Sequence, residues 1–491
     1  MSMIQIEHLT FYYPGSYDAV FEDVSFRFDT RWRLGLVGRN GRGKTTLLSL
    51  LQGKYPYRGQ ILHSTAFGAF PQQVAEPGLP TRAVLEQICP EAEEWRLLRE
   101  LSRLEVEPGA LDRPYSTLSG GEQAKVQLAA LFCNEGQYLL IDEPTIHLDA
   151  RGRALVAEYL RGQRGFLLIS HDRRFLDGCV DHVLALNRAS IELQSGSFSG
   201  WLERFEARQA AESAQNEQLR RQIHRMEQSA RRTADWSDRV EASKSGAADR
   251  GYVGHKAAKM MKRAKCIEAR QNKAIAEKSA LLRDAEEAEA LRLAPLPCRP
   301  GPLLTVQEAA VCYDGAPVCA PVSFVLRPGE RIALEGANGS GKSSLLRLVC
   351  GQAAGHTGRV AAAPGLVVSY VPQDTGGLSG PLAGFAAAHG LDESRFFALL
   401  RKLGFARVQF EKDLAALSAG QKKKVLLARS LCERAHLYVW DEPLNFIDLY
   451  SRLQIERLVC ASGASMLLVE HDRAFQEAAA HRVVTMRRAG R

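Results

Sequence analysis

The sequence contains one set of motifs twice, and this duplication constrains the fold more than any other feature. The segment GRNGRGKT at 38–45 returns as GANGSGKS at 336–343. FPQ, LSGGEQ, LIDEP and SHDR follow it in the first copy, and VPQ, LSAGQK, VWDEP and EHDR follow in the same order in the second. The separations range only from 298 residues (Lys44 to Lys342) to 301 residues (Gln72 to Gln373). A whole motif set repeated at a nearly constant distance indicates one folding unit that was duplicated.

The chain therefore divides into three predicted parts. Two copies of the unit occupy 1–200 and 301–491, and a segment of different character, 201–300, lies between them. A length of 491 residues suits about three units at roughly 150 residues per domain. The proline-rich stretch 295–300 is typical of a linker at the end of the middle part.

Short apolar runs in each copy predict strands of a mainly parallel sheet. Runs of this kind suit strands that are buried on both faces, and helical stretches separate them, so we expect an α/β fold. The runs are Leu34–Val37, Tyr138–Ile141, Phe166–Ile169, Ile332–Leu334, Leu437–Trp440 and Met466–Val469.

Composition excludes several protein classes. With 45% hydrophobic and 24% charged residues the chain resembles ordinary globular proteins with sizeable cores. The sequence has no run of eighteen apolar residues, so we expect no membrane span. It also begins without a cationic and apolar signal segment, and the expected location is the cytoplasm. Ten scattered cysteines without a C-x-x-C pair indicate reduced thiols and argue against a zinc site.

The middle part has the periodicity of a helical hairpin. Apolar residues recur at helical spacing from Leu219 to Ala230 and every seven residues from Met260 to Ala288. Glycines at 246, 251 and 254 interrupt the pattern between the two runs, as a turn would. Two helices of about 35 residues would make an antiparallel arm roughly 50 Å long.

This arm carries the basic charge of the chain. Residues 220–278 contain sixteen Lys and Arg and seven Asp and Glu, a net charge of +9, whereas the whole chain carries +8. Concentrated cationic charge on an extended element, with Trp236 and Tyr252 among the cations, favours an RNA partner. The alternative is an ordinary solvated coiled-coil surface, on which mixed charges are common.

The repeated G-x-x-x-x-G-K-[ST] motif is a phosphate-binding loop. Its glycines let backbone N–H groups approach phosphate oxygens, and the N-terminus of the following helix favours negative charge. Lys44 and Lys342 would reach the β- and γ-phosphates of ATP, and the hydroxyls of Thr45 and Ser343 would hold Mg²⁺. Two copies in the same context make a chance match implausible.

Acidic and histidine residues follow other predicted strands. Asp142 and Asp441 would bind Mg²⁺ directly or through water, and Glu143 and Glu442 follow them, placed to orient or deprotonate the attacking water. His171 and His471 end another strand in each copy, where we interpret them as γ-phosphate sensors. A lone aspartate or histidine at these places is more often structural, but the repetition of the whole set favours catalysis.

The combination resembles the ATP-binding cassette ATPases, because Leu118-Ser119-Gly120-Gly121-Glu122 matches their signature. The resemblance covers both copies. It implies two cassettes of one chain that pair head to tail as a monomer, so that each ATP is held by one phosphate loop and the opposite signature. The implied fold is α/β, with two tandem ABC-type P-loop ATPase domains joined by a long α-helical hairpin. Tyr13 and Tyr313 stand where the family stacks an aromatic ring on adenine; an ordinary strand tyrosine is the alternative.

The resemblance assigns residues to both ATP sites. The first is formed by Tyr13, Gly38, Arg39, Asn40, Gly41, Arg42, Gly43, Lys44, Thr45, Thr46, Gln72, Asp142, Glu143 and His171, and closed by Ser418, Gly420 and Gln421. The second is formed by Tyr313, Gly336, Ala337, Asn338, Gly339, Ser340, Gly341, Lys342, Ser343, Ser344, Gln373, Asp441, Glu442 and His471, and closed by Ser119, Gly120, Gly121 and Glu122. Gln72 and Gln373 join the implied Mg²⁺ ligands Thr45, Asp142, Ser343 and Asp441.

Two cassettes around a charged linker are similar to the F branch of this superfamily, whose members act on ribosomes. TADWS at 233–237, DRGY at 249–252, HKAAKMMKR at 255–263, GQKKKV at 420–425 and WDEPLNFID at 440–448 match its antibiotic-resistance proteins of the lincosamide, streptogramin A and pleuromutilin type. The resemblance implies an arm that contacts large-subunit rRNA, displaces the peptidyl-site tRNA and protects translation from drugs at the peptidyl-transferase centre, with hydrolysis permitting release. The implied RNA contacts are Arg239, Lys244, Arg250, Tyr252, His255, Lys256, Lys259, Lys262, Arg263 and Lys265.

Two departures from the family pattern affect these expectations. Ala419 stands where the signature usually has glycine, and we expect less tight closure of the first site. Ile146 replaces the usual asparagine and removes an amide from the loop between the sites; an effect on hydrolysis and an effect on communication are both open. Two other functions also remain open: a housekeeping translation factor of the same branch, and the tandem ATPase of a membrane importer, a class that lacks such a basic hairpin.

Overall fold

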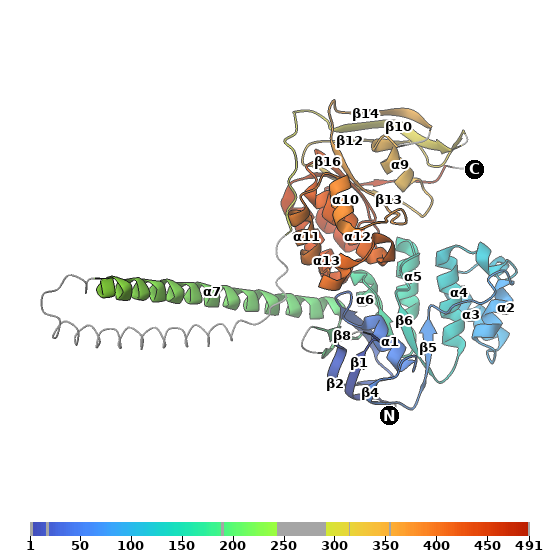
Figure 1. Cartoon of the computed structure of the whole chain (residues 1–491). Coiled ribbons are helices and arrows are strands. Elements are labelled where there is room, and N and C mark those ends of the chain that lie inside the picture. The colour runs from blue at the N-terminus through green and yellow to red at the C-terminus, as the bar shows by residue number, and fades with distance from the viewer. Residues whose placement is uncertain are drawn as a thin grey trace, which may run out of the picture. The chain divides into compact units, whose positions relative to one another are not determined.

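The computed structural model describes residues 3–15, 19–187, 191–242, 291–313, 315–352 and 355–489. The chain forms two compact units, one made of residues 1–199 and 290–491 and the other of residues 200–289. The first unit contains both repeated copies, called here the first and second cassettes (Figure 1). Within the described part of the chain, each helix is either too short or too polar to cross a bilayer.

The central sheet of each cassette contains the predicted strands. In the first cassette the order is β5-β6-β7-β3-β8-β9, parallel except for the antiparallel pair β8 and β9. The second cassette has the parallel order β15-β16-β17-β13-β18. The bounds are β3 Arg33–Gly38, β5 Ala66–Phe70, β6 Gln137–Asp142, β7 Phe166–Ile169, β8 His182–Leu186, β9 Ile191–Ser195, β13 Arg331–Glu335, β15 Val368–Val371, β16 Leu437–Asp441, β17 Ser465–Val469 and β18 Arg482–Thr485. The predicted α/β class and mainly parallel sheets are confirmed.

A smaller antiparallel sheet accompanies each central sheet. In the first cassette its order is β2-β1-β4, and in the second cassette β10 pairs with β11, β12 and β14. These strands are β1 Met3–Tyr12, β2 Ala19–Asp29, β4 Arg58–Leu62, β10 Leu304–Tyr313, β11 Ala316–Pro317, β12 Val322–Leu326 and β14 His356–Ala362. The buried-run criterion does not identify them, because their residues alternate between buried and exposed faces.

Helices enclose the sheets at matching places in the two cassettes. In Figure 1, α2, α3 and α4 lie together in the first cassette and α10, α11 and α12 in the second. The first cassette contains α1 Lys44–Leu51, α2 Thr81–Ile88, α3 Glu94–Arg103, α4 Gly120–Cys133, α5 Ala150–Arg161 and α6 Arg173–Cys179. The second contains α9 Lys342–Val349, α10 Leu382–Ala388, α11 Glu393–Lys402, α12 Ala419–Cys432, α13 Leu449–Ser462 and α14 Arg473–Ala479.

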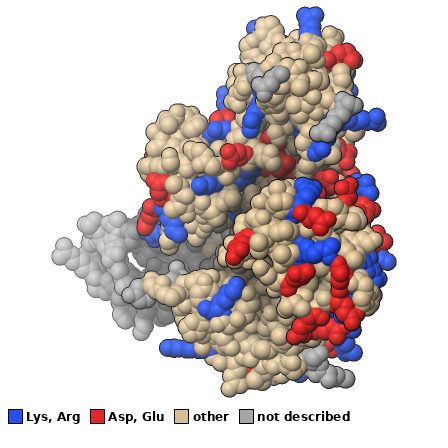
Figure 2. All heavy atoms as spheres, turned by 90° about the vertical axis from the view of Figure 1, so that its right-hand side faces the viewer, with Lys and Arg blue, Asp and Glu red and all other residues tan. Residues whose placement is uncertain are grey.

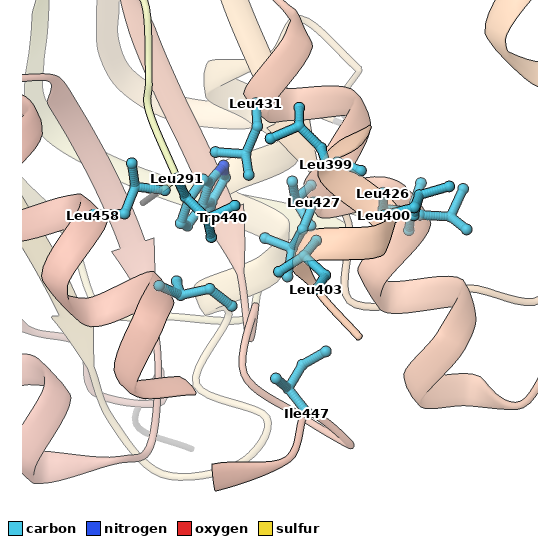
Figure 3. Close-up of a cluster of buried hydrophobic side chains, with 14 of the residues drawn as sticks. Leu291, Leu399, Leu400, Leu403, Leu426, Leu427, Leu431, Trp440, Ile447 and Leu458 are labelled. Carbon is cyan, nitrogen blue, oxygen red and sulfur yellow. The ribbon is translucent and has the colours of Figure 1, made fainter. Parts of the chain in front are cut away.

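A large buried cluster holds the helices of the second cassette against its sheet. Trp440 from β16, Leu427 and Leu431 from α12 and Leu458 from α13 belong to it (Figure 3). Leu291 is part of the same cluster, and the Leu296 N–H donates to the Ala435 carbonyl oxygen at 2.9 Å. The chain thus packs into the second cassette several residues before position 301.

The middle unit contains one long described helix. Helix α7, Phe198–Ala242, has 45 residues, which corresponds to about 68 Å at a rise of 1.5 Å per residue, longer than the 35 residues predicted. Asn216 and Ile223 are buried and Leu219 is half-buried, whereas Glu217, Gln218, Arg221, His224 and Arg225 are exposed. A buried stripe at steps of three and four agrees with the predicted seam. The second predicted helix and the turn lie outside the described residues.

The described surface of the cassettes carries no strong excess of one charge on the face that Figure 2 shows. Lys and Arg side chains alternate there with Asp and Glu side chains. Such a mixed surface fits the sequence, in which residues 220–278 alone exceed the net charge of the whole chain. Long-range attraction of a polyanion to this face is therefore not expected.

We predict that Trp440→Ala destabilises the second cassette by about 3–5 kcal/mol, because it removes a large buried side chain and leaves a cavity. Trp440 has 0% exposure, and its Nε1 donates to Ser430 Oγ at 3.0 Å. Urea unfolding followed by far-UV circular dichroism measures the change. Trp95 is 58% exposed, so Trp95→Ala should cost less than about 1 kcal/mol; equal losses for the two variants would contradict this packing.

Candidate ATP sites

Each phosphate loop connects a buried strand to a helix. The first loop lies between β3 and α1, and the second between β13 and α9. Gly43 and Gly341 precede the helices with φ of 85° and 86°, a backbone region unfavourable for other residues. A Cβ on Gly43 would also lie 2.6 Å from Val20 Cγ1. Glycine is therefore needed at this position both for conformation and for space.

The lysine of each loop is held over the loop's own backbone. Lys44 Nζ donates to the carbonyl oxygens of Gly38 at 2.7 Å and Arg39 at 3.2 Å. Lys342 Nζ makes the equivalent bonds at 2.8 Å and 3.1 Å. Burial lowers the pKa of both lysines, while the nearby carboxylates oppose that shift. A buried cation on a loop of backbone amides is suited to binding phosphate.

Aspartates at the ends of β6 and β16 lie beside the loops. Asp142 Oδ2 accepts from Thr45 Oγ1 at 3.0 Å. Burial raises the pKa of Asp142, and raises that of Asp441 to about 6 although the nearby Ser343 hydroxyl opposes it. Within the described residues neither carboxylate oxygen of Asp441 has a hydrogen-bond partner of good geometry. A buried, unsatisfied carboxylate such as that of Asp441, beside the Ser343 hydroxyl, fits a hard divalent cation such as Mg²⁺.

The glutamates after these aspartates have a strained backbone. Glu143 has φ of 49° and Glu442 has φ of 47°, values that cost non-glycine residues about 1–3 kcal/mol. Their N–H groups donate to the carbonyl oxygens of Ile169 at 2.9 Å and Val469 at 2.8 Å. The ends of neighbouring strands thus hold both glutamates in this conformation, which aims their carboxyl groups at the histidines.

The two glutamate–histidine pairs have similar geometry but different electrostatics. His171 Nε2 lies 3.4 Å from Glu143 Oε1, and His471 Nε2 lies 3.3 Å from Glu442 Oε1. Burial raises the pKa of Glu143 to about 8, although the cavity leaves 21% of its side chain accessible and Arg452 acts in the opposite direction. Burial and Lys44 lower the pKa of His171. Burial also acts to raise the pKa of Glu442, but the hydrogen bond with His471 lowers it overall.

The signature segments begin helices α4 and α12. Ser119 Oγ accepts from the Glu122 N–H, and the Glu122 carboxylate accepts from the Ser119 N–H at 2.7 Å, which completes a capping box. Ser418 and Gln421 form the same arrangement in α12. These caps satisfy backbone groups at the helix start and fix the conformation of each signature.

Two cavities combine the phosphate loop of one cassette with the signature of the other. The first has a volume of about 580 Å³ and the second about 900 Å³. Asn40 Nδ2 donates to the Phe446 carbonyl oxygen at 3.3 Å, across the two cassettes at the first site. The first is lined by Tyr13, Asn40, Gly41, Gly43, Lys44, Thr45, Thr46, Asp142, Glu143, His171, Ser418, Ala419, Gly420 and Gln421. The second is lined by Ser119, Gly120, Gly121, Glu122, Ala337, Asn338, Gly339, Gly341, Lys342, Ser343, Ser344, Gln373, Glu442 and His471.

Several expected residues lie beside the cavities rather than on their walls. The two tyrosines are equivalent: Tyr13 and Thr46 share a hydroxyl hydrogen bond at 2.8 Å, and Tyr313 donates to Ser344 at 3.1 Å, but only Tyr13 lines its cavity. Gly38, Arg39, Arg42, Gln72, Gly336, Ser340 and Asp441 are likewise not among the lining residues. Of the expected RNA contacts, Arg239 belongs to α7, and the remaining nine lie outside the described residues.

The loop that carries the glutamine, Gln72 after β5 and Gln373 after β15, is held differently in the two cassettes. Lys423 Nζ donates to the carbonyl oxygens of Pro372 at 2.7 Å and Asp441 at 2.8 Å, and burial lowers its pKa to about 8. The first cassette has Ala124 at the equivalent position. There Gln127 exchanges two hydrogen bonds with the backbone of Gln72, at 3.1 Å and 3.0 Å. The repeated motifs did not predict the hydrogen bonds of Lys423 or those of Gln127.

A buried ion pair under the first site was also not predicted. Lys424 Nζ lies 2.7 Å from Asp448 Oδ2, and the two side chains are 5% and 1% exposed. Burial acts to raise the pKa of Asp448, but Lys424 lowers it overall. Lys424 also lines the first cavity, and Arg488 lines the second, where it donates to the Asn338 carbonyl oxygen at 3.1 Å. The lysine run at 422–424 was the only sequence signal for this pair.

Lys424→Met is expected to destabilise the second cassette by about 3–5 kcal/mol, because it leaves the buried carboxylate of Asp448 unpaired. Differential scanning calorimetry at neutral pH measures the loss. Arg151→Met is the control, since its ion pair with Glu105 is exposed and worth at most about 1 kcal/mol. A melting temperature unchanged by Lys424→Met would rule out the pair as a structural element.

The geometry agrees with comparisons to known proteins. Residues 21–146 and 319–445, together more than half of the chain, match the ABC transporter family. The ribosome protection protein VmlR of Bacillus subtilis is 27% identical over 93% of this chain and 82% of its own. The energy-dependent translational throttle protein EttA of Haemophilus influenzae is 25% identical over 93% and 87%.

Solved structures share the fold. The crystal structure of the complex of archaeal ribosomal stalk protein aP1 and archaeal ribosome recycling factor aABCE1 matches with a TM-score of 0.60 and 20% identity, over 92% of this chain and 83% of that one. Duplicated phosphate loops, strand-end carboxylates and opposed signatures therefore occur here in a known architecture. The chain belongs to the ABC transporter family, carries two of its ATPase domains in tandem, and hydrolyses ATP.

Proposed function

We propose that the protein is an ABC-F ATPase of the cytoplasm that binds the ribosome and acts through its arm. Similarity over 93% of the chain to a ribosome protection protein and to a translational throttle protein supports this. The observation that carries the proposal is the net charge of +9 on residues 220–278, between the two ATPase domains, while the rest of the chain sums to −1. Phosphate backbone is the partner that such local charge suits best.

The proposed chemistry uses both composite sites. Glu143 and Glu442 orient or deprotonate the water that attacks the γ-phosphate, while His171 and His471 sense that phosphate. Lys44 and Lys342 bind the β- and γ-phosphates, and the opposite signature closes each site. Thr45 and Asp142 in the first site, and Ser343 and Asp441 in the second, would hold Mg²⁺, which would supply positive charge beside the phosphate oxygens. Gln72 and Gln373 are further proposed ligands.

The cassettes and the arm are proposed to work together. ATP binding pairs the cassettes, and pairing directs the arm toward large-subunit rRNA and the peptidyl-site tRNA. The cationic residues proposed to contact RNA are Arg239, Lys244, Arg250, His255, Lys256, Lys259, Lys262, Arg263 and Lys265, with Tyr252 as a stacking group. Hydrolysis then permits release.

The more specific role we propose is protection from antibiotics that bind the large subunit near the peptidyl-transferase centre. Similarity to VmlR and the matching arm motifs support it. A housekeeping translation factor is the second candidate, supported by the comparable similarity to EttA. Both candidates share the ATPase residues, so the arm determines which role applies.

The double variant Glu143→Gln, Glu442→Gln is expected to bind ATP and to remain on the ribosome. Glutamine keeps the side-chain shape but cannot accept the proton of water, so the release step stops. Cosedimentation with ribosomes in excess ATP measures this, with wild-type protein as the control. Free dissociation of the double variant would count against the mechanism.

Expression in a drug-sensitive bacterium should raise the inhibitory concentration of a pleuromutilin or a lincosamide. The double variant, expressed at the same level, should not protect, since it cannot leave the ribosome. Growth inhibition is read across a drug series, with an aminoglycoside as the control drug because it acts on the small subunit. Unchanged sensitivity, together with ribosome binding of the wild type, would favour the housekeeping role.

A further inference from the structure

A further cavity lies between the cassettes, beside the two ATP cavities. It has a volume of about 330 Å³ and is lined by residues of α5, of α6 and of the start of α14. This volume is within the range of small-molecule sites, roughly 300–1,000 Å³. Its charged lining residues are Arg153, Glu158, Arg161, Asp172, Arg174 and Arg473. Cations thus outnumber carboxylates on its walls.

The duplicated fold has an equivalent place in its other half, where an ion pair is formed. Arg173 of α6 and Arg473 of α14 are equivalent, because each ends the repeated His-Asp-Arg motif. Arg173 pairs with Glu456 of α13, and the two side chains are only 14% and 18% exposed. The residue of α5 equivalent to Glu456 is Ala157, which lines the cavity together with Arg473. Arg473 therefore faces a methyl group where Arg173 has a carboxylate.

The equivalence of α5 and α13 is fixed by a shared contact. Arg153 Nε donates to the Leu148 carbonyl oxygen at 3.1 Å, and Arg452 Nε donates to the Ile447 carbonyl oxygen at 2.9 Å. The two arginines are 299 residues apart, and so are the two acceptors. Ala157 and Glu456 have the same separation, so they occupy the same turn of the two helices.

The same alignment explains why a cavity is present in one half. Ala150 and Ala154 line it, and their equivalents on α13 are Leu449 and Leu453. Both leucines are buried, with exposed fractions of 1% and 9%. Three alanines of α5 thus stand where α13 has two leucines and a glutamate. The smaller side chains leave room for a ligand.

Two arginines of the cavity are not neutralised by the protein. The other two form the ion pairs Arg153–Asp172 and Arg174–Glu477. Among the residues that the structure describes, the guanidinium groups of Arg161 and Arg473 have no ion pair and no hydrogen bond. Both side chains are exposed, and the carboxylate of Glu158, the remaining acidic lining residue, is paired with neither. The cavity is therefore suited to an anion.

The chemistry of the walls favours a phosphate group. A guanidinium presents its donors in a planar fork that matches phosphate oxygens, and a phosphate monoester carries a charge of about −1.5 to −2 at pH 7 with three acceptor oxygens. That charge is enough for two guanidinium groups, whereas a carboxylate carries a single charge. Phe175 and Gly178 add an apolar wall. Since a water molecule occupies about 30 Å³ in the liquid, the cavity also has room for an organic part.

We propose that this cavity binds the phosphate group of a small molecule, with Arg473 and Arg161 as its ligands. The phosphate would pair with Arg473 as Glu456 pairs with Arg173 in the other half. Its source is either inorganic phosphate or a phosphorylated metabolite whose organic part lies against the apolar wall. The inference does not depend on the proposed ribosomal role.

A ligand in this cavity would lie against residues of both ATP sites. His471 lines this cavity and the second ATP cavity. Arg153 and Asp172 line this cavity and the first ATP cavity. The site is therefore distinct from the phosphate loops but adjoins both of them through shared side chains.

Equilibrium dialysis of the full-length protein with radiolabelled inorganic phosphate tests the proposal. A non-hydrolysable ATP analogue and Mg²⁺ are present in excess, so that phosphate cannot bind the phosphate loops. Wild-type protein should bind a single phosphate per chain. Arg473→Gln should weaken this binding by about tenfold or more, because a charge-assisted contact is lost. Arg359→Gln, which removes an exposed arginine of β14, is the control and should bind as the wild type does.

A second variant rebuilds the ion pair of the other half. Ala157→Glu places a carboxylate where α13 has Glu456, so it should neutralise Arg473, fill the cavity and abolish phosphate binding. The fold already accommodates this pair at the equivalent place, and circular dichroism should show an unchanged helix content. Ala157→Ser adds an oxygen without charge and should bind phosphate as the wild type does.

Phenyl phosphate, used as a competitor of the labelled phosphate, separates the two sources. Displacement at a concentration about tenfold below that of unlabelled phosphate would identify a phosphorylated metabolite, because the ring gains apolar contact. Equal concentrations would identify inorganic phosphate. The proposal is overturned by wild-type protein that binds no phosphate under these conditions, or by binding that neither Arg473→Gln nor Ala157→Glu reduces.

Discussion

Both ATP sites depend on carboxylates at the ends of buried parallel strands. Asp142 ends β6 after the buried run Tyr138–Ile141, Asp441 ends β16 after the buried run Leu437–Trp440, and burial raises the pKa of both aspartates. A carboxylate in this position is costly unless cations surround it. The phosphate-loop lysines supply part of that charge, and a divalent cation would supply the rest. The same burial that makes the apolar sheet stable therefore creates a site that favours a metal–phosphate complex.

The two cassettes share this arrangement of charged residues but differ in the side chains that hold the neighbouring loops in place. Both cassettes keep the loop lysine, the strand-end aspartate and the glutamate–histidine pair at nearly equal distances. The supporting side chains differ. The second cassette has Lys423 where the first has Ala124, and in the first cassette Gln127 holds the loop that carries Gln72. Each cassette thus satisfies the buried backbone groups of that loop with a different side chain, as burial requires. Such exchanges allow the two sites to differ chemically while the fold stays the same.

Neither ATP site is formed by one cassette alone. Each cavity is lined by a phosphate loop and by a capped signature from the opposite copy. Capping boxes at Ser119 and Ser418 fix the conformation of the signatures, so little conformational entropy would be lost there on binding. Ion pairs such as Arg173 with Glu456 and Arg174 with Glu477 also join the cassettes at α6, α13 and α14. Because both cassettes line each site, ATP that contacts both of them would favour their pairing.

The sequence alone determined the duplicated α/β architecture, three strands of each central sheet and the identity of the phosphate loops, because apolar runs and glycine spacing are local properties. It also indicated the start of a long helix in the middle part, although α7 runs further than its periodicity suggested. The small antiparallel sheets, the Lys424–Asp448 pair and the anchoring of Glu442 by Gln373 and Asn445 were decided only by the tertiary structure. Apart from Asn445, which follows Glu442 by three residues, these features join residues that are distant in sequence, and their side chains can be matched only after the strands and helices have brought them together.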